Sequence, residues 1–269
     1  MNIFKDLNKF GFEYNKDINI YEMEEIKMKK KEALNSEKGK SVKELLYTKT
    51  VTCPVCNTTF KAISVKSSSY KVDSRDSDLF IRYSKVNPYL YDPWVCEHCG
   101  YAAMKTDFLK IKDYEIDLIK NNISSKWHHK PYPDEYTVEI AIERYKLCLL
   151  NAIESESKSS KKAMICLKLA WMYRLLNGDD SSEKELFFMD QALKGLEFAY
   201  TNEGLPIYGM DVFTLTYLLG ELNRRLGKYE EALSWFSKVI VSPSVKPSLK
   251  ELARTQKDIC KAEQKEKQS

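Results

Sequence analysis

The second half of the chain has the hydrophobic pattern of amphipathic helices. Over residues 137–154, apolar residues recur every three or four positions, which is the period of a helix with one buried face. Residues 161–177 and 183–201 each carry two such stripes, and a helix that is apolar on two faces is buried between neighbours. Three further helices are predicted at about 211–226, 229–241 and 248–265. Short connections between these six helices favour an antiparallel stack.

Residues 46–108 follow a different pattern, in which short runs alternate apolar and polar positions. These runs are rich in Thr, Val, Ser and Tyr, which is typical of half-buried strands. The predicted strands lie in TKTVTC, TFKAISV, YKVDS, LFIRYSKV and PWVC. Between them, Asp73, Asp76 and Asp78 mark a turn that we interpret as solvated. A calcium loop is the alternative, but the Gly and the bidentate Glu that such a loop needs are missing.

These patterns divide the chain into four parts and predict an α+β fold. The parts are a polar arm (1–45), a β-rich module (46–108), a connecting segment (109–136) and an all-α domain of helical hairpins (137–269). The arm is rich in lysine, but its charges alternate in sign, which weakens a nucleic-acid or membrane patch. We therefore expect the arm to be mobile or loosely docked.

Composition excludes several classes of protein. Hydrophobic residues make up 43% of the 269 residues, so the chain is not wholly disordered. Its apolar runs are too short to span a membrane, and MNIFKDLNKF lacks the apolar core of a signal peptide. A cytoplasmic protein is therefore expected. The formal net charge is +4, and four thiolates on one zinc ion would lower it to about +2, which weakens the global argument for nucleic-acid binding.

Two CxxC pairs predict a metal site. They are Cys53-Pro-Val-Cys56 and Cys96-Glu-His-Cys99, and Gly100 follows the second pair. Each pair forms a tight turn with two sulfurs, and two such turns complete the tetrahedral shell of a structural Zn²⁺ ion. A full shell leaves no position for a catalytic water. Redox-active pairs are the alternative, but a thioredoxin-type CxxC lies at a strand-to-helix junction, whereas strand-like residues flank both pairs here.

The remaining cysteines and histidines have simpler interpretations. Cys148 and Cys166 have apolar neighbours and are predicted to be small buried hydrophobes. His98 should face solvent, because the sulfurs on either side of it point inward. The adjacent histidines of KWHHKPYP are interpreted as loop residues, with a second metal site as the alternative.

Residues 214–243, TLTYLLGELNRRLGKYEEALSWFSKVIVSP, resemble a tetratricopeptide repeat. The matching positions are Leu219, Gly220, Gly227, Tyr229, Ala232, Phe236 and Pro243. Gly220 and Ala232 are small where two antiparallel helices would cross closely. In such repeats the first helix lines a concave surface, which would expose Tyr217, Glu221, Arg224 and Arg225. The two arginines could bind an acidic peptide; a solvated charged face is the alternative.

The order of these motifs resembles one known family. LLYTKTVTCPVCNTTFKA, SRDSDL and VNPYLYDPWVCEHCGYAA are followed by AIERYKLCLLNA, CLKLAWMYRL and the repeat. This order is similar to the DUF2225 family of uncharacterised bacterial proteins, most of all to its clostridial and related Firmicutes members, over residues 45–260. The resemblance implies a fold and zinc ligation by the four paired cysteines, but no reaction.

Three functions remain open from the sequence. The first is a zinc-stabilised adaptor whose helical repeat binds a protein or peptide. The second is nucleic-acid binding by the β module, where Lys66, Lys71, Arg75, Arg82 and Lys85 are interleaved with Tyr70, Tyr83, Tyr89, Tyr91 and Trp94. The third is a thiol-redox protein or another enzyme. No HExxH, GxxxxGK, GxSxG or GxGxxG motif is present, so we expect neither an enzyme nor a small-molecule substrate.

Overall fold

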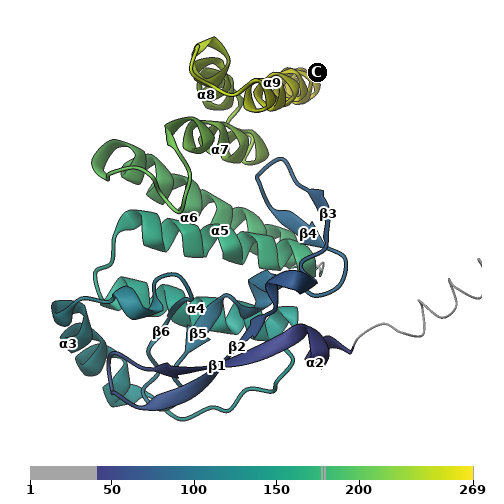
Figure 1. The fold of residues 1–269 in the computed structure, drawn as a ribbon. Helices are drawn as coiled ribbons and strands as arrows, with labels where there is room; N and C mark the ends of the chain where they lie inside the picture. Colours follow the sequence, from purple (N-terminus) through teal and green to yellow (C-terminus); the bar gives the residue numbers. More distant parts are fainter. Residues whose placement is uncertain (1–40, 177, 179, 269) are drawn as a thin grey trace, which may run out of the picture. The chain divides into compact units, whose positions relative to one another are not determined.

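The strands come first along the chain and the helices follow (Figure 1). The computed structural model describes residues 41–176, 178 and 180–268. The predicted N-terminal arm therefore lies almost wholly outside the described residues. An α+β fold with a cysteine cluster beside small strand pairs, as in a zinc ribbon, is confirmed.

The described strands form three antiparallel pairs. The pairs are β1 (Leu46–Thr52) with β2 (Thr59–Val65), β3 (Val72–Arg75) with β4 (Ile81–Tyr83), and β5 (Pro93–Val95) with β6 (Ala102–Met104). Short helical segments flank and connect them: α2 (Val42–Leu45), η2 (Ser67–Ser69), η3 (Pro88–Tyr91) and η4 (Phe108–Lys110). The first and last pairs are hairpins whose turns are the two CxxC motifs. The sequence pattern missed β6, because all three of its residues are buried and it shows no alternation.

The helices from Asp113 to Gln268 include the six predicted ones, which begin and end within a few residues of their predicted positions, and two within the predicted connecting segment that the sequence pattern did not predict. They are α3 (Asp113–Asn122), η5 (Ser124–Lys126), α4 (Val138–Glu154), α5 (Ser159–Leu176), α6 (Ser181–Asn202), α7 (Val212–Arg225), α8 (Tyr229–Val241) and α9 (Pro247–Gln268). Side chains fix two of the starts: the Thr137 hydroxyl accepts a hydrogen bond from the Ile140 amide, and the Asp211 carboxylate accepts one from Thr214. Among the described helices, none is long and apolar enough to cross a membrane.

Close helix crossings build the core of the stack. A Cβ added to Gly195 of α6 would lie 2.7 Å from the Cβ of Ala163 on α5, so only glycine allows this approach. On α7, a Cβ at Gly220 would lie 2.8 Å from the Phe236 ring of α8, which confirms the close crossing predicted there. The tetratricopeptide-like character of the stack stays a prediction.

The β module and the helical stack share one hydrophobic core. Phe80, Val95, Ala102 and Met104 of the module are buried together with apolar residues of α4, α5, α6 and α7. A second cluster surrounds the cysteines and includes Trp94, Tyr101 and Phe108. The module is therefore seated on the helices, and the boundaries at 109 and 136 stay predictions.

Candidate metal centre

The two CxxC turns have the same backbone geometry. In each turn, the backbone amide of the first cysteine donates to the carbonyl of the residue five positions later. The backbone amide of the residue four positions after that cysteine donates to the cysteine's own carbonyl. The bonds are Cys53 N to Thr58 O (2.9 Å), Asn57 N to Cys53 O (2.9 Å), Cys96 N to Tyr101 O (2.8 Å) and Gly100 N to Cys96 O (2.8 Å). Asn57 and Gly100 close the turns at φ 59° and 75°. Glycine adopts a positive φ without strain, and Asn is among the residues that tolerate it.

The four sulfurs lie at the spacing of a metal shell. The Sγ atoms of Cys53, Cys56, Cys96 and Cys99 all lie within 4.8 Å of one another. Cys53 Sγ is 3.6 Å from Cys99 Sγ, and Cys56 Sγ is 3.7 Å from Cys96 Sγ. Sulfurs bound about 2.3 Å from a tetrahedral ion are separated by about 3.8 Å, whereas a disulfide joins its sulfurs at about 2.0 Å. The four sulfurs are therefore spaced so that they could hold one metal ion.

Hydrogen bonds within the cluster shift the pKa values of three of its four thiols. Hydrogen bonds from Cys53 and Cys99 lower the pKa of the Cys96 thiol. The same contacts raise the pKa values of the thiols that donate: the bond to Cys96 raises that of Cys53 and the bond to Cys53 raises that of Cys99. Cys96 is therefore the thiol of the cluster whose pKa the hydrogen bonds lower. A divalent cation would displace the remaining protons, because metal binding requires deprotonated sulfur.

Residues of the connecting segment and α4 hold the second turn in place. The Trp127 indole Nε1 donates to the Glu97 carbonyl at 2.7 Å, and His129 Nδ1 lies 3.1 Å from the same oxygen. Asn151 Nδ2 donates to the Gly100 carbonyl at 3.2 Å. Sequence reasoning missed Trp127 and Asn151, because their partners are backbone atoms 30 and 51 positions away. His98 is exposed, as predicted.

We expect Gly100→Ala to destabilise the protein more than Gly209→Ala. Both glycines have a positive φ, 75° and 79°, so each alanine costs about 1–2 kcal/mol of backbone strain. A Cβ at Gly100 would also lie 2.6 Å from the Trp127 ring, whereas nothing lies within 4 Å of one at Gly209. Overpacking adds about 1–3 kcal/mol. Urea unfolding with saturating zinc measures the difference; equal losses would show that Trp127 does not clamp the turn.

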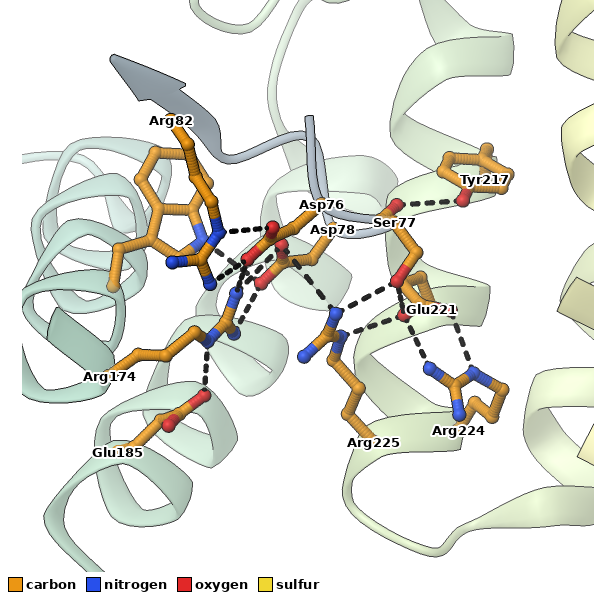
Figure 2. Close-up of polar contacts among 11 residues, drawn as sticks. Asp76, Ser77, Asp78, Arg82, Arg174, Glu185, Tyr217, Glu221, Arg224 and Arg225 are labelled. Atoms are coloured by element: carbon orange, nitrogen blue, oxygen red, sulfur yellow. Dashed lines mark hydrogen bonds and ion pairs between the residues drawn. The ribbon is translucent and has the colours of Figure 1, made fainter. Parts of the chain in front are cut away.

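A second polar cluster forms where the β3–β4 turn contacts the helices (Figure 2). The turn residues Asp76 and Asp78 point toward Arg174 of α5. Asp78 is 0% exposed, so the predicted solvated turn is wrong at this residue. Its carboxylate accepts from Arg174 Nη2 at 2.7 Å and from the Trp171 indole at 3.0 Å. Burial raises the pKa of Asp76, but bonds from Arg82 and Arg174 outweigh it and the net shift lowers this pKa.

The same turn covers the predicted partner-binding residues of α7. Ser77 donates to Glu221 at 2.6 Å, and its carbonyl accepts from the Tyr217 hydroxyl at 2.7 Å (Figure 2). Tyr217 and Glu221 are 0% exposed, so the exposure expected of them is wrong. Glu221 also accepts from both arginines, at 2.8 Å from Arg224 and 2.7 Å from Arg225. The chain's own turn thus satisfies Tyr217, Glu221 and Arg225, Glu221 and Glu263 pair with Arg224, and the role of these side chains in partner binding stays a prediction.

The basic and aromatic residues that the sequence suggested for nucleic-acid binding do not all lie in one cluster. Arg82 is paired to Asp76 through two bonds of 2.7 and 2.9 Å. The remaining residues of the basic set, Lys66, Lys71, Arg75 and Lys85, are exposed. Tyr91 accepts a hydrogen bond from the Tyr136 amide at 3.1 Å. Among the described residues, only the four cysteines form a cluster that could hold a metal.

A comparison with protein families finds a match. The model described as "Uncharacterized protein conserved in bacteria (DUF2225)" matches residues 46–260, a span that contains both CxxC turns, the β3–β4 turn and helices α3 to α8. No curated protein and no solved structure matches the chain. The Firmicutes origin stays a prediction.

Proposed function

The chain belongs to the DUF2225 family, and we propose that it is a non-enzymatic adaptor that a structural Zn²⁺ ion stabilises. Four cysteine ligands would fill the ion's coordination shell, which supports a folding role over catalysis. A cytoplasmic location fits this proposal, because reducing conditions keep thiols available to a metal. The helical stack would then bind a protein partner.

An apolar groove in the helical stack carries this proposal. It has a volume of about 500 Å³ and runs over α4, α5 and α6. Phe187 and Phe198 in its lining are 57% and 56% exposed, and Ile153 is 52% exposed. Exposed aromatic residues that gather in one groove are typical of interaction sites, whereas scattered single ones are not.

The chemistry of the groove favours an amphipathic helix with acidic flanks. Its floor includes Leu149, Ala163 and Phe188, which suits apolar side chains spaced along one helix face. The charged residues in its lining are Lys162 and Lys194, of which Lys194 pairs with Asp190 at 2.7 Å and Lys162 supplies the surplus positive charge. Opposite charge at the rim of a docked helix would speed association and select the partner. We therefore assign the groove to a helical segment of a partner protein with Asp or Glu beside its apolar face.

We expect Phe187→Asp with Phe198→Asp to abolish capture of this partner. The two aspartates would place charge in the apolar groove and repel acidic flanks. Pull-down with cross-linking and mass spectrometry measures recovery and identifies the bound segment. Val241→Asp is the matched control, because Val241 is 77% exposed but does not line the groove.

The outcomes distinguish specific binding in the groove from non-specific binding to exposed apolar residues. Loss in the double variant, retention in Val241→Asp and a cross-linked acidic amphipathic helix would support the proposal. Equal recovery by all three proteins, or a cross-linked segment without helical apolar spacing, would overturn it.

A further inference from the structure

A small tyrosine-lined pocket lies between the β module and α5. Its volume is about 210 Å³, and the rings of Tyr70, Tyr83, Tyr89 and Tyr91 contribute to its walls. Tyr70 and Tyr83 meet edge to face at 5.9 Å, and Tyr83 and Tyr89 at 6.0 Å. Drug-sized molecules occupy pockets of about 300–1,000 Å³. This smaller pocket suits one planar aromatic group such as a single base.

Ser64 of β2 supplies an unused polar group to the same pocket. The residue is 1% exposed and lines the pocket. Its Oγ atom has no hydrogen-bond partner among the described residues. A buried hydroxyl without a partner costs free energy, so a ligand that hydrogen-bonds to it would remove a penalty that the free protein carries.

The charged side chains of the pocket disfavour the binding of a cationic ligand. Tyrosine rings set at right angles are also found in cages for quaternary ammonium groups. Here, however, the charged lining residues are Lys105, Lys168 and Asp92, and Lys168 already pairs with Asp92. Lys105 is exposed and has no ion-pair partner among the described residues. The surplus charge is therefore positive, which favours an aromatic ligand that carries an anion.

We propose that this pocket binds one nucleotide unit, with the base against the tyrosine rings, a base edge on Ser64 Oγ and the phosphate near Lys105. Bases stack on aromatic side chains whatever their identity, and cations beside the rings hold phosphate. The exposed Lys66, Lys71 and Lys85 lie on the same module and would extend a phosphate track. The inference is independent of the adaptor role, because none of these residues lines the helical groove.

The test uses the full zinc-loaded chain at low salt. Calorimetric titration with AMP or UMP probes a free nucleotide, and fluorescence anisotropy with a labelled ten-nucleotide oligouridylate probes an unpaired nucleotide of a strand. Ribose 5-phosphate, which lacks a base, should not compete. Ser64→Ala should weaken binding about three- to tenfold, as for the loss of one hydrogen bond, without lowering the melting temperature, because no partner is lost.

Aromatic variants supply the matched comparison. Tyr83→Leu keeps apolar bulk but removes a ring, and we expect binding about tenfold weaker or worse. Tyr114→Leu removes a tyrosine that is 54% exposed outside the pocket, and should change nothing. Binding of mononucleotide or oligonucleotide that is sensitive to Ser64→Ala and Tyr83→Leu would support the proposal and identify the source. No binding of either probe, or binding that both variants leave unchanged, would overturn it.

Discussion

Cys53→Ala or Cys96→Ala should abolish metal binding and unfold the β module. Each substitution removes one of four ligands whose sulfurs lie within 4.8 Å. Structural zinc contributes on the order of 10 kcal/mol in small zinc-binding peptides. The strands around the site are short. Without an ion, most of the four crowded thiols would stay protonated and uncharged. Besides the ion, the apolar cluster of Trp94, Tyr101 and Phe108 joins the two turns, and a module with so small a core needs a metal to hold its fold.

Metal content by mass spectrometry and a thermal melt before and after chelation measure this effect. Wild-type protein should hold one zinc ion per chain, and chelation should melt the strands first. Cys260→Ala is the control, because Cys260 is buried but donates only to the Tyr229 carbonyl of the helical stack; it should keep its zinc. A wild-type chain that holds no zinc and forms a Cys53–Cys56 or Cys96–Cys99 disulfide would instead favour the thiol-redox alternative.

The sequence was sufficient for features that local rules determine. The helices could be predicted because the 3.6-residue period of their apolar positions is a local signal. The four cysteines could be assigned to one site because a CxxC turn is also local, and two such turns are needed to complete one shell. Gly220 could be assigned to a close helix crossing because its contact, Phe236, lies in the adjacent helix of the same hairpin.

Features that depend on distant contacts could not be predicted in the same way. Asp78 and Arg174 are 96 positions apart, and nothing in SRDSDL distinguishes a buried carboxylate from a solvated one. The α7 face illustrates the consequence. Its first-helix positions would be exposed in an isolated repeat, but the β3–β4 turn covers Tyr217 and Glu221. Trp127 and Asn151 bind backbone carbonyls, which carry no sequence signal.

Asp78→Ala should be the most destabilising substitution outside the metal site. Asp78 is 0% exposed and accepts from Arg174 and Trp171. Removing one partner of a buried ion pair costs about 3–5 kcal/mol, because the other charge is left buried. Arg174 keeps Asp76 and Glu185 at 2.9 and 2.7 Å, so we expect about 3 kcal/mol. That loss lowers the melting temperature by about 6–12 °C in a domain of this size.

Two comparisons show whether the buried charge is responsible. Asp78→Asn keeps an oxygen that can accept from Trp171 but removes the charge, so it should retain part of the stability. Asp180→Ala breaks an exposed pair in which Asp180 Oδ2 lies 3.6 Å from Lys184 Nζ, and such pairs contribute little; its melting temperature should not change. If Asp78→Ala melts like Asp180→Ala, the β3–β4 turn is only loosely held on α5 and α7. The covered face of α7 would then be open to a partner, and the residues predicted from the repeat would regain their place as a binding surface.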